Sequence, residues 1–168
     1  VAARLLPSEK ARAVMRTEPY DFFGGTGAVL PEQVFFDLDR IRSLYAESGF
    51  RDVGFRWAGA AGERRRTRTA EGRDTVWTWI DGARAFRVRK PASTHGVYVE
   101  IGIEEGPRTT LGQVVVQGVT AVPEAAAREE LGLETGGAYS LMRVRDAATR
   151  LARRLSAEGY LGVAIDVT

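Results

Sequence analysis

The sequence predicts an α+β fold made of two similar units in tandem. Two long segments carry apolar residues at intervals of three and four, as amphipathic helices do, and several short segments alternate apolar with polar residues, as half-buried strands do. Residues 39–55 and 149–165 also repeat one pattern of helix, Gly–aromatic pair and strand. A chain of 168 residues with 44% apolar and 27% charged residues is long enough for two small globular domains.

The first half of the chain predicts two helices followed by a strand. A short helix is expected at residues 7–17 and, after a break rich in glycine, a longer helix at residues 31–48. Gly49 is placed to end the longer helix, because glycine adopts the left-handed conformation at low cost. Phe50 can then fold back against the apolar face of that helix, and residues 51–57 alternate as a half-buried strand.

Residues 58–96 differ in composition from their surroundings. The polar segment at residues 63–73 contains a cluster of arginines, and we interpret it as a solvated loop; the arginines are Arg64, Arg65, Arg66, Arg68 and Arg73. Residues 74–90 predict either a two-stranded hairpin or one strand extension with its return, because an Asp-Gly pair at residues 81–82 separates two β-rich runs.

The middle of the chain predicts two more strands joined by a turn. Residues 97–104 alternate strictly between apolar and polar side chains. Gly106 and Pro107 lie in the turn that follows, and residues 111–118 are expected to form the second of these strands.

The last third of the chain predicts two helices and a final strand. A helix is expected at residues 123–131, followed by a longer one at residues 140–158, whose first residue is a serine that can cap it. Gly159 ends the longer helix and Tyr160 follows it. Residues 163–167 then alternate as a strand.

The two halves align with an offset of 110 residues. Gly49 then corresponds to Gly159, and Phe50 corresponds to Tyr160. We interpret these four residues as determinants of the fold rather than as a binding site, because they let a helix reverse onto a sheet within about two residues. Such self-similarity predicts tandem domains.

Three motifs, taken in order, resemble one protein family. The first is the helix end at residues 44–50 with the strand after it. The second is the strand–turn–strand segment at residues 99–118, which includes Gly106 and Pro107, and the third is the helix end and strand at residues 151–163. On these motifs the chain is similar to tandem polypeptide-transport-associated (POTRA) domains of the surface antigen family. These are periplasmic modules that precede the barrel in outer-membrane assembly and secretion proteins.

The resemblance implies two tandem β-α-α-β-β units, each a small three-stranded sheet with two helices on one face. The first unit is expected at residues 1–107, with an Arg-rich insertion at about residues 58–96, and the second at residues 108–168. Both units are expected to be incomplete, because the first strand of the first unit is short or absent and the second unit lacks its last strand. We therefore expect a fragment of a longer protein, with a C-terminal membrane β-barrel of the same polypeptide beyond Thr168.

By the same resemblance, the chain is expected to be a chaperone-like interaction module on the periplasmic face of the Gram-negative outer membrane. Its partners would be nascent outer-membrane proteins and accessory assembly lipoproteins, bound as extended segments by strand addition to a sheet edge. An open edge also favours strand exchange or dimerisation between chains. The expected edges follow the two Gly–aromatic pairs and comprise Asp52, Val53, Gly54, Phe55, Arg56, Gly162, Val163, Ala164 and Ile165.

The arginine cluster leaves a second function open. Four arginines with two tryptophans nearby could contact an anionic surface, either lipid headgroups or nucleic acid; they are Arg64, Arg65, Arg66, Arg68, Trp77 and Trp79. Against this, 24 basic residues are nearly balanced by 22 acidic ones, and acidic residues lie within the cluster. We therefore favour the solvated loop and expect no nucleic-acid partner; salt-dependent binding would distinguish the two.

The residues offer little for catalysis or for a cofactor. The chain has no cysteine and a single histidine, His95, which excludes cysteine nucleophiles, thiolate metal sites and triads that need a second histidine. Acidic pairs such as Asp37 and Asp39 do not converge on one point, and these two suit a solvated helix face. Residues 24–27 lack the lysine of a phosphate-binding loop. We expect neither an enzyme nor a cofactor-binding protein.

Overall fold

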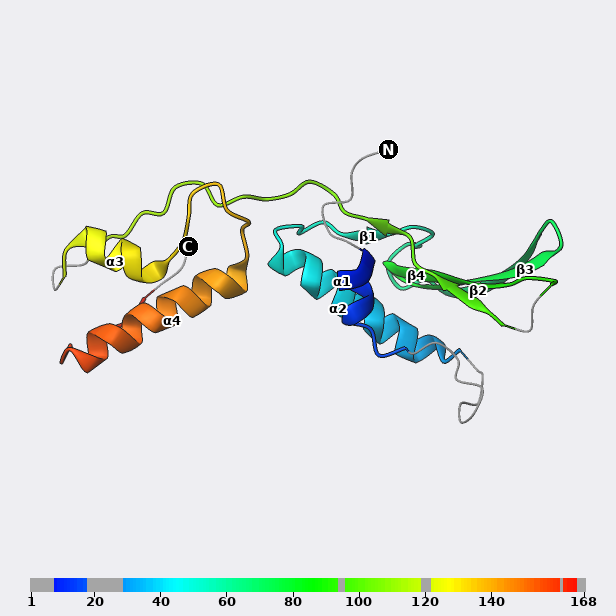
Figure 1. The fold of residues 1–168 in the computed structure, drawn as a ribbon, viewed down its shortest axis with the longest axis horizontal. Helices are drawn as coiled ribbons and strands as arrows, with labels where there is room; N and C mark the ends of the chain where they lie inside the picture. The colour runs from blue at the N-terminus through cyan, green and yellow to red at the C-terminus, as the bar shows by residue number, and fades with distance from the viewer. Residues whose placement is uncertain (1–7, 18–28, 94–95, 119–121, 161, 166–168) are drawn as a thin grey trace. The chain divides into compact units, whose positions relative to one another are not determined.

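The computed structural model describes residues 8–17, 29–93, 96–118, 122–160 and 162–165. These residues form four α-helices and two antiparallel sheets (Figure 1), so the predicted α+β class is confirmed. The chain divides into two compact units. The first comprises Val1–Tyr45 and Asp52–Gly106, and the second comprises Ala46–Arg51 and Pro107–Thr168.

Helix α1 (Ser8–Ala13) is shorter than the helix predicted at residues 7–17. The residues after it are held by helix α2 (Pro31–Glu47), where the carboxylate of Asp37 accepts hydrogen bonds from the backbone N–H groups of Arg16 at 2.9 Å and Thr17 at 2.8 Å. Because these N–H groups donate to a side chain, they do not continue the helix.

Helix α2 agrees with its predicted bounds to within one residue, and its apolar face is buried as expected. The buried apolar side chains are Val34, Phe35, Leu38, Ile41 and Tyr45. Gly49 follows with φ +94°, and Phe50 is 2% exposed, as predicted for the Gly–aromatic pair. Gly49 is required for a second reason, since a Cβ there would lie 2.6 Å from the carbonyl oxygen of Thr109.

The strand predicted at residues 51–57 is reduced to β1 (Gly54–Phe55), which pairs with β6 (Ile103–Glu104) in an antiparallel two-stranded sheet. The strand ends early because the backbone turns immediately after it. Trp57 adopts a positive φ of 71°, and the N–H of Ala58 donates to the carbonyl oxygen of Phe55 at 3.1 Å.

A second, four-stranded antiparallel sheet is formed largely by residues 58–96. Its strand order is β2 (Arg64–Glu71), β3 (Asp74–Asp81), β4 (Arg84–Lys90) and β5 (Tyr98–Glu100). The hairpin predicted at residues 74–90 is confirmed as β3 and β4.

The interpretation of residues 63–73 as a loop is wrong. The arginine-rich segment forms β2, which pairs with β3 along its whole length, from Arg64 opposite Asp81 to Glu71 opposite Asp74. Gly72, with φ +63°, allows the tight turn that returns the chain into β3. All eight residues of β2 are exposed, and a strand that buries neither face needs no apolar alternation.

The strand predicted at residues 97–104 is divided between the two sheets. Its first part, β5, pairs with β4, whereas its last part, β6, pairs with β1. Between them, the carbonyl oxygen of Gly102 accepts a hydrogen bond from the N–H of Arg56 at 2.7 Å. A Cβ on Gly102 would lie 2.7 Å from the Cβ of Arg56, so this close approach requires glycine.

The second unit contains the two predicted helices, α3 (Glu124–Leu131) and α4 (Leu141–Ala157). They share a core of buried side chains formed by Ala127, Leu131, Ala147, Leu151 and Leu155. Ser140 caps α4 as expected, because its hydroxyl accepts a hydrogen bond from the N–H of Arg143 at 3.3 Å.

The predicted strands of the second unit are only partly realised. Among the described residues of 109–118 the backbone forms one isolated bridge, between Thr110 and Ala138, and no regular strand. Residues 162–165 also form no strand, and Leu161 and residues 166–168 lie outside the described residues. Four half-buried side chains from these segments nevertheless pack against the helical core: Val114, Val116, Val163 and Ile165.

The second Gly–aromatic pair agrees with its prediction only in part. Gly159 has φ +97°, as expected for a residue that ends a helix in the left-handed conformation. Tyr160, however, is 42% exposed whereas Phe50 is 2% exposed, so the two aromatic residues of the repeat differ in burial. His95 and residues 18–27, including the Gly-rich segment, lie outside the described residues.

Candidate functional site

The first predicted edge, Asp52–Arg56, alternates between core and solvent. Val53 and Phe55 are 6% and 3% exposed, so their side chains anchor the segment in the core of the first unit. Asp52 and Arg56 are exposed, and Gly54 is paired with Glu104 of β6. The segment is therefore well anchored, but only Gly54–Phe55 is a regular strand.

The second predicted edge, residues 162–165, shows the same alternation. Val163 and Ile165 are half-buried against α3 and α4, whereas Gly162 and Ala164 are exposed. The two candidate edges thus resemble each other in burial pattern, although the structure assigns a strand to the first alone among their described residues.

The turn residues Gly106 and Pro107 follow β6. Gly106 has φ +66°, and a Cβ there would lie 2.9 Å from the carbonyl oxygen of Asp52. A side chain would therefore disturb the approach of the two backbones on either side of the turn, which supports a structural role for this glycine.

The four arginines that the sequence groups together have different environments. On β2, Arg64, Arg66 and Arg68 share one face of the sheet, because they lie opposite Asp81, Trp79 and Trp77 in the register with β3. Arg65 points to the other face and forms an ion pair with Glu63 at 2.8 Å.

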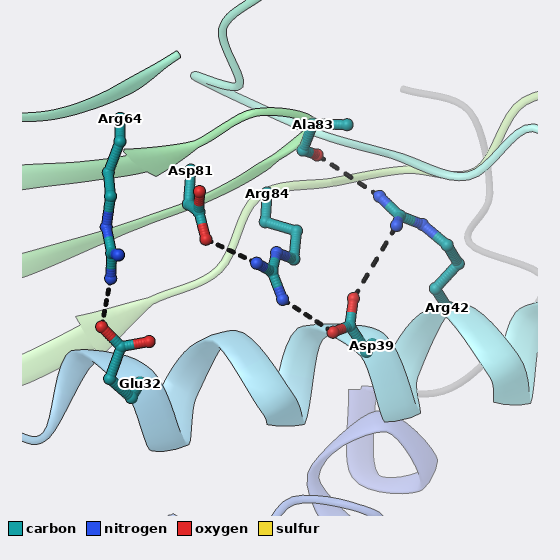
Figure 2. A network of polar contacts seen from close by, with 7 residues as sticks. All are labelled: Glu32, Asp39, Arg42, Arg64, Asp81, Ala83 and Arg84. Atoms are coloured by element: carbon teal, nitrogen blue, oxygen red, sulfur yellow. Dashed lines mark hydrogen bonds and ion pairs between the residues drawn. The ribbon is translucent and has the colours of Figure 1, made fainter. Parts of the chain in front are cut away.

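Arg64 belongs to a polar network that joins α2 to the four-stranded sheet (Figure 2), where it forms an ion pair with Glu32. Arg84 of β4 forms ion pairs with Asp39 of α2 at 2.8 Å and with Asp81 of β3 at 2.5 Å. Arg42 completes the network by donating to the carbonyl oxygen of Ala83 at 3.3 Å (Figure 2).

This network has a structural role. Burial lowers the pKa of Arg84, but the hydrogen bonds and negative charges of Asp39 and Asp81 outweigh it, so the pKa lies above its ordinary value. The guanidinium of Arg84 also lies 5.2 Å from the ring centroid of Phe35, and this ring makes an edge-on contact with Phe86 of β4 at a centroid distance of 5.2 Å. The network therefore holds the helix in register with the sheet and offers no unpaired charge to a ligand.

Arg66 and Arg68 differ from these residues because they lie on tryptophan rings. The guanidinium of Arg66 is 4.6 Å from the ring centroid of Trp79 and 5.8 Å from that of Trp77, and Arg68 is 6.0 Å from Trp77. These are cation–π distances. Within the described part of the chain, neither arginine forms an ion pair with a carboxylate. Two exposed positive charges are therefore available beside the edge of the sheet.

The sequence missed this arrangement because it depends on register. Arg-x-Arg at residues 66–68 and Trp-x-Trp at residues 77–79 are each visible, but only the two-residue turn at residues 72–73 places them opposite one another. The other face of the sheet carries similar pairs that we did not predict, with Arg87 4.7 Å from the ring of Trp57 and Arg89 5.7 Å from that of Tyr98.

The placement of Asp37 on a solvated helix face is also wrong, because this residue is 0% exposed. Burial raises its pKa, but hydrogen bonds from the Thr17 side chain, the backbone N–H groups of Arg16 and Thr17, and the Arg40 side chain outweigh burial and lower it. With both oxygens occupied by these donors, Asp37 is a structural anchor rather than a candidate catalytic base.

Among the described helices, none combines the length and the apolar character needed to cross a membrane.

No curated protein sequence matches the chain. The POTRA family model, described as a surface antigen variable number repeat, matches residues 109–168. POTRA domains are non-catalytic protein-interaction domains, and in outer-membrane assembly factors they are periplasmic. Residues 109–168, which contain α3 and α4, are therefore similar to a POTRA domain, a type of domain found in proteins of outer-membrane assembly and secretion.

Proposed function

We propose that this chain is a periplasmic, chaperone-like interaction module of an outer-membrane assembly or secretion machine. The observation that carries the proposal is the POTRA match to residues 109–168, in a region whose two helices bury one shared core. We further propose that residues 1–107 form a second POTRA-like unit with an insertion at about residues 58–96. In support, α2, the Gly49–Phe50 pair, β1 and β6 follow in the order that the family pattern implies.

We propose strand addition as the binding mode. In the sheet order β1–β6, one side of β1 has no strand partner among the described residues, and the buried Val53 and Phe55 hold the segment in place. Backbone hydrogen bonds would provide most of the affinity, so binding would tolerate many client sequences. Nascent outer-membrane proteins and accessory assembly lipoproteins are the partners that we propose.

A site-specific photocrosslinking experiment tests this edge. A benzophenone side chain is introduced separately at Asp52 and at Arg56, both exposed, and the chain is mixed with a peptide of about ten residues from an outer-membrane strand. We expect adducts at both positions. Arg153, exposed on α4, serves as the control position and should give none. Adducts at Arg153 without adducts at Asp52 or Arg56 would remove the edge assignment.

A further inference from the structure

Strand β2 forms a second edge, outside the residues that match the POTRA model. It is the first strand in the order β2–β3–β4–β5, and all eight of its residues are exposed. It is also four times as long as the two-residue β1. An edge strand presents unpaired N–H and C=O groups to solvent, and it can therefore pair with another extended chain.

The register identifies which backbone groups of β2 point outward. Glu71 and Asp74 close a two-residue turn and form a hydrogen-bonded pair, so every second residue of β2 bonds to β3. The N–H of Gly82 donates to the carbonyl oxygen of Glu63 at 2.5 Å. Glu63 is an even number of residues from Glu71, so this bond follows the same alternation. The N–H and C=O groups that point away from β3 are therefore those of Arg64, Arg66, Arg68 and Ala70.

The same alternation places positive charge beside these outward groups. Arg66 and Arg68 lie on one face of the strand, and their guanidinium groups lie on the rings of Trp77 and Trp79. A guanidinium held over an aromatic ring uses none of its N–H groups in a hydrogen bond to that ring, so they can bind a carboxylate in two places at once. The tryptophans also restrict the arginine side chains, which lowers the entropy that binding would cost.

We propose that β2 binds an extended peptide segment with acidic side chains at alternate positions. The segment would add a fifth strand to the sheet, and its carboxylates on the tryptophan face would meet Arg66 and Arg68. Charge complementarity favours an acidic segment, because these two guanidinium groups have no carboxylate partner within the described residues. Charged residues on an edge strand disfavour pairing with most chains, but a row of arginines repels basic strands and attracts acidic ones.

This inference deepens the proposed function by naming the chemistry of one class of partner, and it concerns a different edge. The direct test uses the 168-residue chain and three fluorescent peptides of the same length. One alternates glutamate with threonine, one replaces each glutamate by glutamine, and one replaces each glutamate by lysine. We expect the glutamate peptide to bind, with an affinity that falls as salt rises, and the other two to bind at least about tenfold more weakly.

Two variants separate the charge from the backbone. In Arg66→Gln/Arg68→Gln both charges beside the tryptophans are lost, and we expect affinity for the glutamate peptide to fall about tenfold or more. The matched control is Arg65→Gln/Arg73→Gln, which removes two charges from the opposite face and the turn and should change affinity less than about threefold. Ala70→Pro removes one outward N–H without touching the ladder to β3, and should weaken binding at unchanged charge.

Three results would overturn the inference. Equal affinity for the glutamate and glutamine peptides would show that the arginines do not select the partner. Failure of all three peptides would mean that the arginines only protect the edge. Binding to phosphatidylglycerol vesicles that Ala70→Pro leaves unchanged, without peptide binding, would assign the surface to lipid headgroups. None of these results bears on Asp52 and Arg56, so a failure here remains distinguishable from a failure of the proposed function.

Discussion

At the scale of single residues, Asp37 shows how one buried carboxylate can organise a segment distant in sequence. It lies on α2 and receives hydrogen bonds from Arg16 and Thr17, which are 21 and 20 residues away. The sequence gives no sign of this contact, because hydrophobic periodicity reports only whether a position faces the core. The burial of a charged side chain depends on donors brought from elsewhere in the chain.

Asp37→Asn should destabilise the first unit by about 2 kcal/mol, because the amide cannot accept all the hydrogen bonds that the carboxylate accepts. The pKa of Asp37 is lowered in the folded state from its ordinary value of 3.8. Its contribution to stability is therefore fully present above pH 3.8 and is lost as the pH falls through the lower folded-state pKa. Urea unfolding from pH 7 to about pH 2 measures both effects.

Asp39→Asn is the control for this prediction, because Asp39 is 46% exposed and its ion pairs should contribute no more than about 1 kcal/mol. If the Asp37→Asn chain loses stability on acidification as steeply as the unmodified chain, the carboxylate is not the group responsible.

Glycine substitutions test the two reasons given for Gly49. Gly49→Ala should cost more than about 2 kcal/mol, because it combines positive φ with a clash against Thr109. Gly159→Ala meets no atom within 4 Å but has φ +97°, so it should cost about 1–2 kcal/mol. Gly112→Ala meets neither obstacle and should change stability by less than about 0.5 kcal/mol. Urea midpoints in any other order would contradict this account.

At the scale of elements, the sequence predicted best what depends on burial of one face. Helices α2 and α4 and the β3–β4 hairpin were expected with nearly correct bounds, because their apolar residues follow the period of the element. Strand β2 was missed because it buries neither face. For residues 111–118 a strand was predicted and none forms. Their alternating valines pack on the helices, but the backbone makes no regular ladder of hydrogen bonds.

The exposed strand makes a specific prediction for amide hydrogen exchange. Amides that donate to β3 should exchange slowly, and those that point outward should exchange fast, because only the former are protected by the ladder. The slow set is Arg65, Thr67, Thr69 and Glu71; the fast set is Arg64, Arg66, Arg68 and Ala70. Residue-resolved NMR measures this alternation. Uniformly fast exchange would contradict the strand and support the interpretation of this segment as a solvated loop.

At the scale of the whole molecule, each unit has its own core. The first is centred on α2 and the four-stranded sheet, and the second on α3 and α4. All three tryptophans, Trp57, Trp77 and Trp79, lie in the first unit. Tryptophan fluorescence therefore reports on one unit, whereas far-ultraviolet circular dichroism reports on both.

This distribution allows the stabilities of the two units to be measured separately. Leu151→Ala should destabilise the second unit by about 2–5 kcal/mol, since it removes a side chain that is 3% exposed, and should leave the fluorescence transition in place. Phe86→Ala should lower the fluorescence midpoint, through a loss of about 3–5 kcal/mol in the first unit. A single transition that both substitutions shift equally would show instead that the units unfold together.

The hydrogen bond between Arg56 and Gly102 has a consequence for how such a chain can evolve. The backbone leaves β1 at Arg56 and returns to β6 at Gly102, and these two points are joined at 2.7 Å. If residues 58–96 are an insertion, as we propose, a single genetic event could add or remove them without changing the register of the host strands. The contact between Phe35 of α2 and Phe86 of β4 would then have arisen after the insertion, as the helix adapted to the inserted strands.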